Sequence, residues 1–112
     1  MTKFILVETT YPNLRAAKNL AKILLSKNLA ACVQFCEVKS MYFWPKGMNQ
    51  KIQNDREFLV RIKTKNSLYE AVEKIIQNHH SYEIPQILAI QIDQGSKAYL
   101  NWVDSQTETA GK

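Results

Sequence analysis

Two adjacent histidines form the most concentrated group of side chains that could do chemistry. His79 and His80 are followed closely by Tyr82 and Glu83. Imidazole nitrogens bind divalent cations such as Cu²⁺ and Zn²⁺, and a nearby carboxylate can supply a further ligand. Successive helical residues point about 100° apart, so both histidines face one metal only if the helix ends between them or a second subunit contributes. The alternative interpretation is that a histidine in the last turn of a helix binds the free carbonyl groups there.

The cysteines are the other possible soft ligands or nucleophiles. Cys32 and Cys36 lie four residues apart in one expected strand, about 13 Å at the rise of a straight strand, which excludes a disulfide between them. Cys32 lies between Ala31 and Val33, where a cysteine is most simply a small buried apolar residue. Cys36 precedes Glu37, where the apolar alternation lapses, so we expect Cys36 to be the more accessible and more reactive thiol.

No catalytic motif accompanies these residues. The sequence has no glycine-rich phosphate loop, no G-x-S-x-G, no H-E-x-x-H and no paired C-x-x-C. We therefore expect a protein without enzymatic activity. The net charge of +5, from 15 basic and 10 acidic residues, is scattered along the chain, which indicates a solvated surface more than a binding patch.

The elements that must position these residues alternate between strands and amphipathic helices. In the first half, apolar runs and apolar residues at three and four residue steps predict a strand over residues 3–7, a helix over 13–28 and a long strand over 29–44. The Pro and Gly of residues 45–49 predict an exposed turn, and alternation over 51–64 predicts a strand that completes a long hairpin.

The second half repeats the pattern of a helix followed by a strand. Asn66 or Ser67 can cap a helix, and Ser67 with Glu70 has the spacing of a capping box. We expect this helix to end near the two histidines, because the X-Pro step at residues 84–85 disfavours helix. A strand over 87–92 follows, and then a short helix that carries Tyr99, Trp102 and Val103 on one face. The order is that of an α+β, ferredoxin-like βαββαβ fold with a C-terminal helix.

The strand over 29–44 has no polar face. A chain of 112 residues can place one layer of helices over a sheet, so we expect other copies of the chain to supply the second layer. Met41, Tyr42, Phe43 and Trp44, near the end of the hairpin, would be exposed in a monomer, and such patches mark interfaces. The sequence therefore predicts an oligomer joined by its hairpins.

Length and composition limit the other possibilities. We expect residues 1–112 to form one domain, with residues 108–112 flexible. The four successive apolar residues near the N-terminus are too few for a signal peptide or a membrane span, so we expect a cytoplasmic protein.

Five fragments in order resemble the CutA family, named for divalent-cation tolerance. They are LAACV at 29–33, S-x-Y-x-W at 40–44, IKT at 62–64, HHSYEIPQI at 79–87 and AYLNW at 98–102. The resemblance implies a ferredoxin-like protomer in a tight homotrimer and a role in tolerance of copper or other divalent metals. It also implies metal ligands at His79, His80 and, in the A-C-V motif, Cys32. The chain departs from the family pattern at Ser81, at Gln86 and by about four extra residues after Trp44.

These observations leave a leading hypothesis and two alternatives. The leading hypothesis is a homotrimeric, non-enzymatic protein that binds a divalent metal ion such as Cu²⁺ or Zn²⁺. The first alternative is a signalling-type trimer with an anionic effector in clefts between subunits, near Tyr82, Glu83 and Cys36. RNA binding is the second, and it is disfavoured because the central strands offer only Phe4 and Phe58 as aromatics and lack the required glycine. We expect neither a nucleic-acid partner nor a membrane partner.

Overall fold

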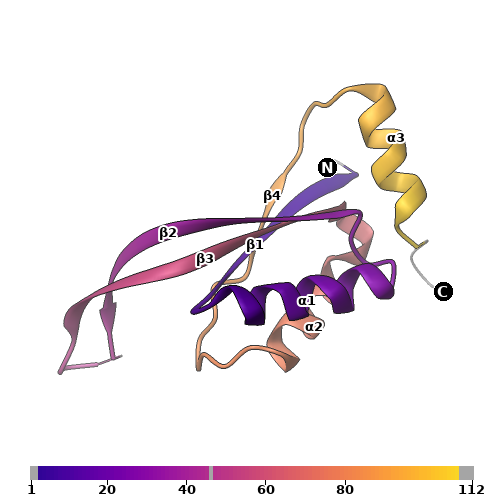
Figure 1. The fold of residues 1–112 in the computed structure, drawn as a ribbon. Coiled ribbons are helices and arrows are strands. Elements are labelled where there is room, and N and C mark those ends of the chain that lie inside the picture. Colours follow the sequence, from indigo (N-terminus) through magenta and orange to yellow (C-terminus); the bar gives the residue numbers. More distant parts are fainter. Residues whose placement is uncertain (1–2, 46, 109–112) are drawn as a thin grey trace.

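The computed structural model describes residues 3–45 and 47–108. Strands and helices alternate through most of this length, and a short 3₁₀ turn, η1, precedes the second helix (Figure 1). The elements are β1 (Phe4–Tyr11), α1 (Leu14–Ser26), β2 (Cys32–Trp44), β3 (Lys51–Lys65), η1 (Asn66–Leu68), α2 (Tyr69–Asn78), β4 (Leu88–Gln91) and α3 (Lys97–Gln106). The predicted α+β, ferredoxin-like order with a C-terminal helix is confirmed.

The four strands form one antiparallel sheet in the order β2-β3-β1-β4. In the register of β1 with β3, Phe4 is opposite Lys65 and Tyr11 is opposite Phe58. β2 and β3 are consecutive in the chain and form the predicted hairpin, whose pairing runs from Cys32 opposite Lys63 to Trp44 opposite Lys51. The first strand of the chain therefore lies inside the sheet, while β2 and β4 form its edges.

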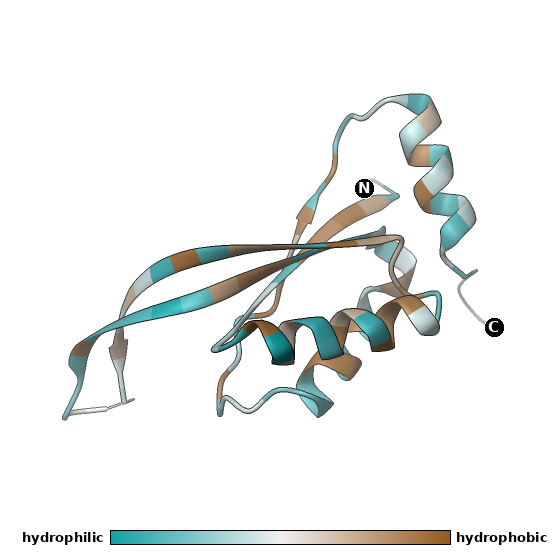
Figure 2. Ribbon diagram, in the orientation of Figure 1, coloured by the Kyte–Doolittle hydropathy of each residue, from teal (hydrophilic) through white to brown (hydrophobic). Residues whose placement is uncertain are grey.

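Helices α1 and α2 cover one face of the sheet and enclose the core with it (Figure 1). Figure 2 shows hydrophobic and hydrophilic residues alternating along α1, as expected of a helix with one buried side. The core consists of apolar side chains from β1, α1, the α1–β2 turn, β3, η1 and α2: Ile5, Val7, Tyr11, Ala17, Leu20, Leu24, Leu29, Ala30, Val60, Ile62, Leu68, Val72 and Ile76.

The opposite face of the sheet is covered only in part. Because side chains alternate along a strand, Leu6 and Glu8 point away from the core that Ile5 and Val7 enter. Ile90 lies opposite Leu6 in the register and is 46% exposed. Helix α3 covers one end of this face, where Lys63 Nζ donates to Tyr99 Oη at 3.1 Å. We call the rest of this surface the open face.

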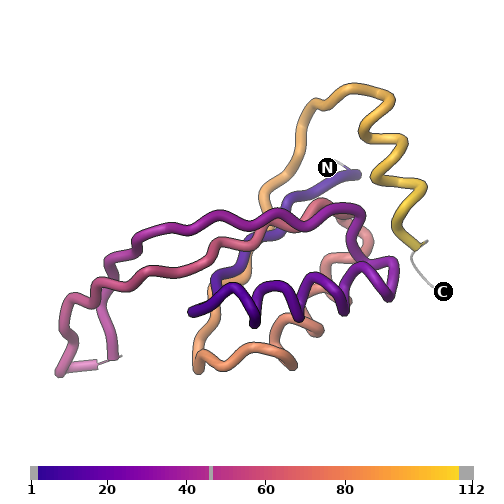
Figure 3. The backbone as a smooth tube through the Cα atoms, in the orientation of Figure 1, coloured from indigo at the N-terminus to yellow at the C-terminus, as the bar shows by residue number. Residues whose placement is uncertain are grey.

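The hairpin extends beyond the helices that cover the rest of the sheet, as the tube in Figure 3 shows. The molecule measures 48 × 26 × 23 Å along its principal axes, and its radius of gyration is 15.1 Å. A compact chain of this length has a radius of gyration of about 13 Å. The described residues of the protomer therefore leave the distal hairpin without a covering layer.

Several element boundaries differ from the predictions. β1 continues past Val7 to Tyr11, because Thr9 and Thr10 are buried and stay paired with β3. β2 begins at Cys32 and not at residue 29, since the Leu29 amide still bonds to the Leu24 carbonyl of α1 at 2.9 Å. β4 is limited to Leu88–Gln91, the residues that pair with β1 from Ile5 to Glu8.

The helix ends also differ from the predictions. Asn13 is the N-cap of α1, and its Oδ1 accepts from the Ala16 amide at 2.9 Å. The predicted capping box at Ser67 is wrong, because η1 comes first and α2 begins after Leu68 without a side-chain cap. The predicted end of this helix near the histidines is confirmed by His79 as its C-cap.

The hairpin tip and the C-terminus were predicted to be a turn and a flexible tail, respectively. Gly47 has φ +95°, the left-handed conformation that the predicted turn requires. The Glu108 amide donates to the Asn28 carbonyl at 2.8 Å, and the other residues of the expected flexible tail, 109–112, lie outside the described residues. None of the helices within the described ranges combines the length and apolar character needed to cross a membrane.

Candidate functional site

His79 lies exposed at the end of α2, where the helix leaves its last carbonyl groups without amide partners. Its Nδ1 is 2.9 Å from the Ile75 carbonyl oxygen. A carbonyl can only accept, so Nδ1 carries the hydrogen and the lone pair of Nε2 remains available. A backbone carbonyl that fixes the tautomer in this way is the usual support of a metal-binding histidine.

His80 has a different environment, between the loop that follows α2 and the end of β1. Its Nε2 donates to the Thr10 carbonyl at 2.6 Å, and its Nδ1 accepts from the Tyr82 amide at 3.2 Å. The ring stacks on Tyr11 with centroids 4.2 Å apart and an angle of 19°. Burial lowers the pKa of His80, although the Thr10 carbonyl acts in the opposite direction. Both nitrogens are engaged, so the neutral imidazole joins the loop to β1.

The third ligand implied by the resemblance, Cys32, does not lie beside the histidines. Cys32 is opposite Lys63 on β3, whereas Thr10, which holds His80, is opposite Leu59. These two positions on β3 are four residues apart, about 13 Å along a strand. Within the described residues, no three His, Cys, Asp or Glu side chains gather closely enough to hold a metal ion.

Two hydrogen-bonded pairs of tyrosine and carboxylate lie near each other, one between the hairpin and the loop after α2 and the other within the hairpin. Tyr82 Oη donates to Glu57 Oε2 at 3.0 Å, and Tyr42 Oη donates to Asp55 Oδ2. Glu57 is only 7% exposed, although it lies on a strand that is mostly exposed at this point. Both pairs therefore connect β2, β3 and the loop on one side of the hairpin.

Both tyrosines border two cavities that share Tyr42, Tyr82 and Ile84, and we call these cavities together the aromatic groove. The first cavity has a volume of about 410 Å³, and Trp44 and Glu83 complete its lining. The second has a volume of about 390 Å³, and its further lining residues are Thr10, Ser40, Met41, Glu57 and Gln86. The described lining residues include no lysine or arginine.

The phenols of the groove are hydrogen-bond donors over the whole physiological pH range. The hydrogen bond to Asp55 is the main cause that raises the pKa of Tyr42 to about 12. Burial, followed by the hydrogen bond to Glu57, raises the pKa of Tyr82 still further. Each hydroxyl keeps its proton and directs it at a carboxylate, so the negative charges of the groove are held by neutral donors.

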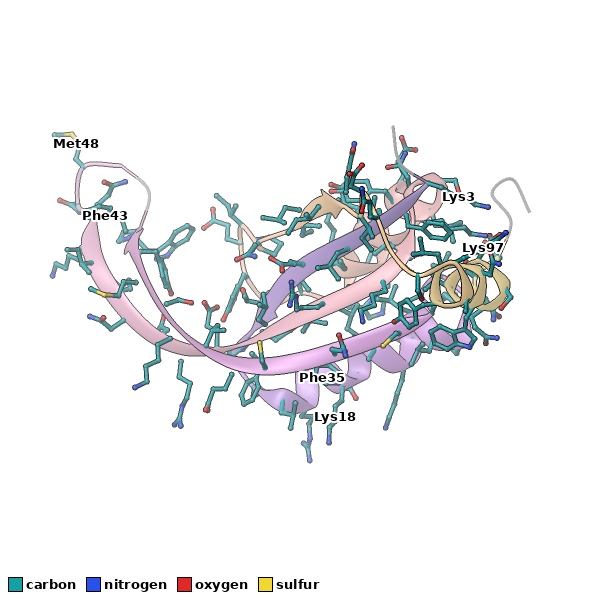
Figure 4. All side chains as sticks on the ribbon, turned by 90° about the horizontal axis from the view of Figure 1, so that it is seen from above. Lys3, Lys18, Phe35, Phe43, Met48 and Lys97 are labelled. Atoms are coloured by element: carbon teal, nitrogen blue, oxygen red, sulfur yellow. The ribbon has the colours of Figure 1, made fainter. Side chains whose placement is uncertain are left out.

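The expected interface residues lie on two different faces of the hairpin. Tyr42 and Trp44 line the groove, whereas Phe43 points the other way. Met41 alternates with Tyr42 along the strand but also contributes to the lining of the second cavity. Met41 is 70% exposed and Phe43 is 63% exposed, and Figure 4 shows Phe43 at the distal end of the hairpin.

Of the other residues predicted to form a site, two line the groove and the cysteines lie elsewhere. Tyr82 and Glu83 line the groove. Cys36 is exposed, lies opposite Leu59 and is not among the described lining residues. Both cysteines are free thiols, as expected. Asp55 and Glu57 were missed by sequence reasoning, although the hairpin register that places them beside Ser40 and Val38 could have indicated them.

Comparison with known proteins gives one consistent result. Residues 5–106 match the family described as CutA1 divalent ion tolerance protein. The chain is 38% identical over 108 residues to the divalent-cation tolerance protein CutA of Archaeoglobus fulgidus, covering 96% of this chain and 100% of that one. It is 40% identical over 101 residues to protein CutA of Mus musculus, covering 89% of this chain and 55% of that protein. The chain thus spans about half the length of the mouse protein, and the same holds for its rice and human relatives.

Solved structures agree with this match. The periplasmic divalent cation tolerance protein CutA of Archaeoglobus fulgidus superimposes with a TM-score of 0.87 at 37% identity, covering 94% of this chain and 99% of that chain. CutA1 from Shewanella sp. SIB1 gives a TM-score of 0.89 at 31% identity, covering 96% and 98%. The similarity therefore includes the long hairpin and the helices on one face as well as the sheet.

Proposed function

This chain belongs to the CutA1 divalent ion tolerance family, and we propose that it is a homotrimer that binds divalent metal ions such as Cu²⁺ without catalysing a reaction. Its role is then tolerance of, or response to, these ions. The observation that carries the metal part is His79, whose exposed Nε2 is oriented by the hydrogen bond from Nδ1 to the Ile75 carbonyl.

The uncovered apolar surfaces support the assembly. Leu88 and Ile90 on the open face are 40% and 46% exposed, and Met41 and Phe43 on the hairpin are more exposed still. Burying such surface against another copy is favourable in proportion to the apolar area removed from water. Arg61 and Glu8 lie on the same face and neutralise each other in an ion pair, with Arg61 Nε 3.2 Å from Glu8 Oε2.

An assembly would also supply the ligands that one protomer lacks. One imidazole does not hold a divalent ion tightly, since structural sites of borderline metals use about four ligands. The described residues of a protomer bring no further ligands together around His79. We propose that the site is completed by side chains of other copies, with Cys32 as the soft candidate that the family resemblance indicates.

Calorimetric titration of the purified oligomer with Cu²⁺ and with Zn²⁺ tests the proposal. We expect His79→Gln to weaken binding at least about tenfold, because it removes the available imidazole nitrogen. Gln77→Ala, an exposed change on the same helical turn, is the matched control and should bind as the wild type does. Cys32→Ser tests the thiol. Equal affinity in the His79→Gln variant and the control would contradict the metal proposal.

A further inference from the structure

The aromatic groove contains a buried negative charge, Glu57, beside which the described residues place no cation. Glu57 is 7% exposed, and its hydrogen bond comes from the neutral hydroxyl of Tyr82, at 3.0 Å. No lysine or arginine among the described residues forms an ion pair with Glu57 or Asp55. Burying an ionised carboxylate is costly, and a neutral donor offsets less of that cost than a cation does. The groove therefore favours a positively charged occupant.

The walls of the groove are aromatic, and they come from two separate parts of the chain. Tyr42 and Trp44 lie two residues apart on β2 and so share a face, which the loop residue Tyr82 approaches. The negative faces of aromatic rings attract a cation within about 6 Å, most strongly at tryptophan. The rings and the carboxylates thus favour the same kind of guest.

The volumes of the two cavities and the hydrogen-bond acceptors of the groove limit which ligand can bind there. Each cavity, at about 410 and 390 Å³, is in the usual size range of small-molecule sites. A compact metal ion would leave the apolar walls unused, and an anion would be repelled by the carboxylates. An alkylammonium group brings three N–H donors for the carboxylate lone pairs, and its carbon chain can lie against the rings.

We propose that the aromatic groove binds a small organic cation with a primary amine, whose ammonium group lies at Glu57 and whose alkyl part packs against Trp44 and Tyr82. The site differs from the proposed metal site, because His79 is not among its described lining residues. It also reverses the charge of the effector that the sequence suggested. The two proposals are therefore tested, and can fail, independently.

Three probes of the same size but different charge test the proposal on the intact protein. Calorimetric titrations with n-butylammonium chloride, n-butanol and sodium butyrate are compared at equal ionic strength. We expect saturable binding of n-butylammonium, with the millimolar affinity usual for so small a probe, and no saturable binding of the alcohol or the carboxylate. Binding of butyrate, or equal responses to all three probes, would overturn the proposal.

A fluorescence titration locates the binding site. Trp44 lines the groove, whereas the other tryptophan, Trp102, lies on α3 at the opposite end of the molecule (Figure 1). In a Trp102→Phe background the emission comes from Trp44 alone. We expect n-butylammonium to change this emission with the same saturation curve as the calorimetry. Saturable heat without any change in the Trp44 emission would place the amine elsewhere and refute the assignment.

Variants with matched controls identify the charge that matters. Glu57→Gln keeps the shape and can still accept from Tyr82, and we expect it to weaken n-butylammonium binding at least about tenfold. Glu73→Gln is the control, because Glu73 accepts from Tyr69 Oη at 3.0 Å in a similar pair on α2. Equal affinity in the two variants would contradict the proposal.

A second variant keeps the proposal testable if the buried glutamate is needed for folding. Trp44→Leu leaves every carboxylate in place and removes one aromatic wall, so we expect a several-fold weaker affinity by calorimetry. Circular dichroism of each variant checks that the fold is retained. If Trp44→Leu binds n-butylammonium as tightly as the wild type, the aromatic groove is not the site.

Discussion

The exposed side of the distal hairpin offers the sharpest test of the assembly. Met41 and Phe43 share a face of β2, and Ile52 lies opposite Phe43 on β3. These side chains are 70%, 63% and 59% exposed, which is unusual for large apolar residues next to one another. The perturbation is the double substitution Met41→Ser and Phe43→Ser, which removes most of this apolar surface and leaves Tyr42 and Trp44 of the groove in place.

The structure gives the size of the expected effect. Added together, the exposed fractions of Met41 and Phe43 correspond to about one and a third fully exposed side chains. Complete burial of one such side chain stabilises by roughly 1.5–3 kcal/mol, so the substitutions remove roughly 2–4 kcal/mol of association free energy per protomer. That is a loss of about 30-fold to several hundredfold in the association constant for each protomer.

Light scattering coupled to size-exclusion chromatography over a dilution series measures this effect. We expect the wild type to keep three times the 13.0 kDa protomer mass, and the double variant to dissociate at much higher concentration. Leu25→Ser, on α1, removes a similar apolar side chain that is 44% exposed and should leave the mass unchanged. A wild type of 13.0 kDa at all concentrations, or a double variant as stable in assembly as Leu25→Ser, would refute the reasoning.

Three further predictions concern the protomer itself. Thr64→Val should lower the free energy of unfolding by about 1–3 kcal/mol in urea titrations, because the buried Leu29 carbonyl loses the Thr64 hydroxyl at 2.7 Å. The hydrogen bond from Lys65 is the main cause that lowers the pKa of Asp104 below 3.8. The difference in unfolding free energy between wild type and Asp104→Asn should therefore be constant above pH 3.8, the ordinary pKa of this carboxyl. It should disappear as the pH falls from there through the lowered pKa of Asp104, as urea midpoints measured at each pH would show. Cys36 is exposed, so iodoacetamide should modify it faster than the half-buried cysteine at the start of the same strand, measured by mass spectrometry of the peptides.

The order of elements could be predicted because each depends on a local pattern. The apolar stripe of α1 and the alternation along β3 are both properties of neighbouring residues. The boundaries could not be predicted in the same way, because distant partners set them. Thr9 and Thr10 look like the start of a turn, yet pairing with Val60 and Leu59 keeps them in β1. The Ser67 cap failed for a related reason, since the chain enters α2 through a 3₁₀ turn.

The histidine pair shows the limit of sequence reasoning at a site. Adjacent histidines look equivalent in the sequence, but the partner of His80 is a carbonyl 70 residues away, at Thr10. That contact gives the two rings opposite tautomers and leaves only His79 with an available nitrogen. Glu57 was missed because an acidic residue in an alternating strand is normally solvated, and only the approach of Tyr82 buries it.

The position of β1 inside the sheet has a consequence for synthesis of the chain. Within this sheet β1 is made before the other strands, yet about 54 more residues must follow Tyr11 before its partner β3 ends at Lys65. At 5–20 residues per second, this takes roughly 3 to 11 s, during which neither β3 nor α2 is available to cover Ile5 and Val7. The β2–β3 hairpin, by contrast, can close as soon as it leaves the exit tunnel. The nascent N-terminal segment is therefore the part of this polypeptide that most needs protection by a chaperone.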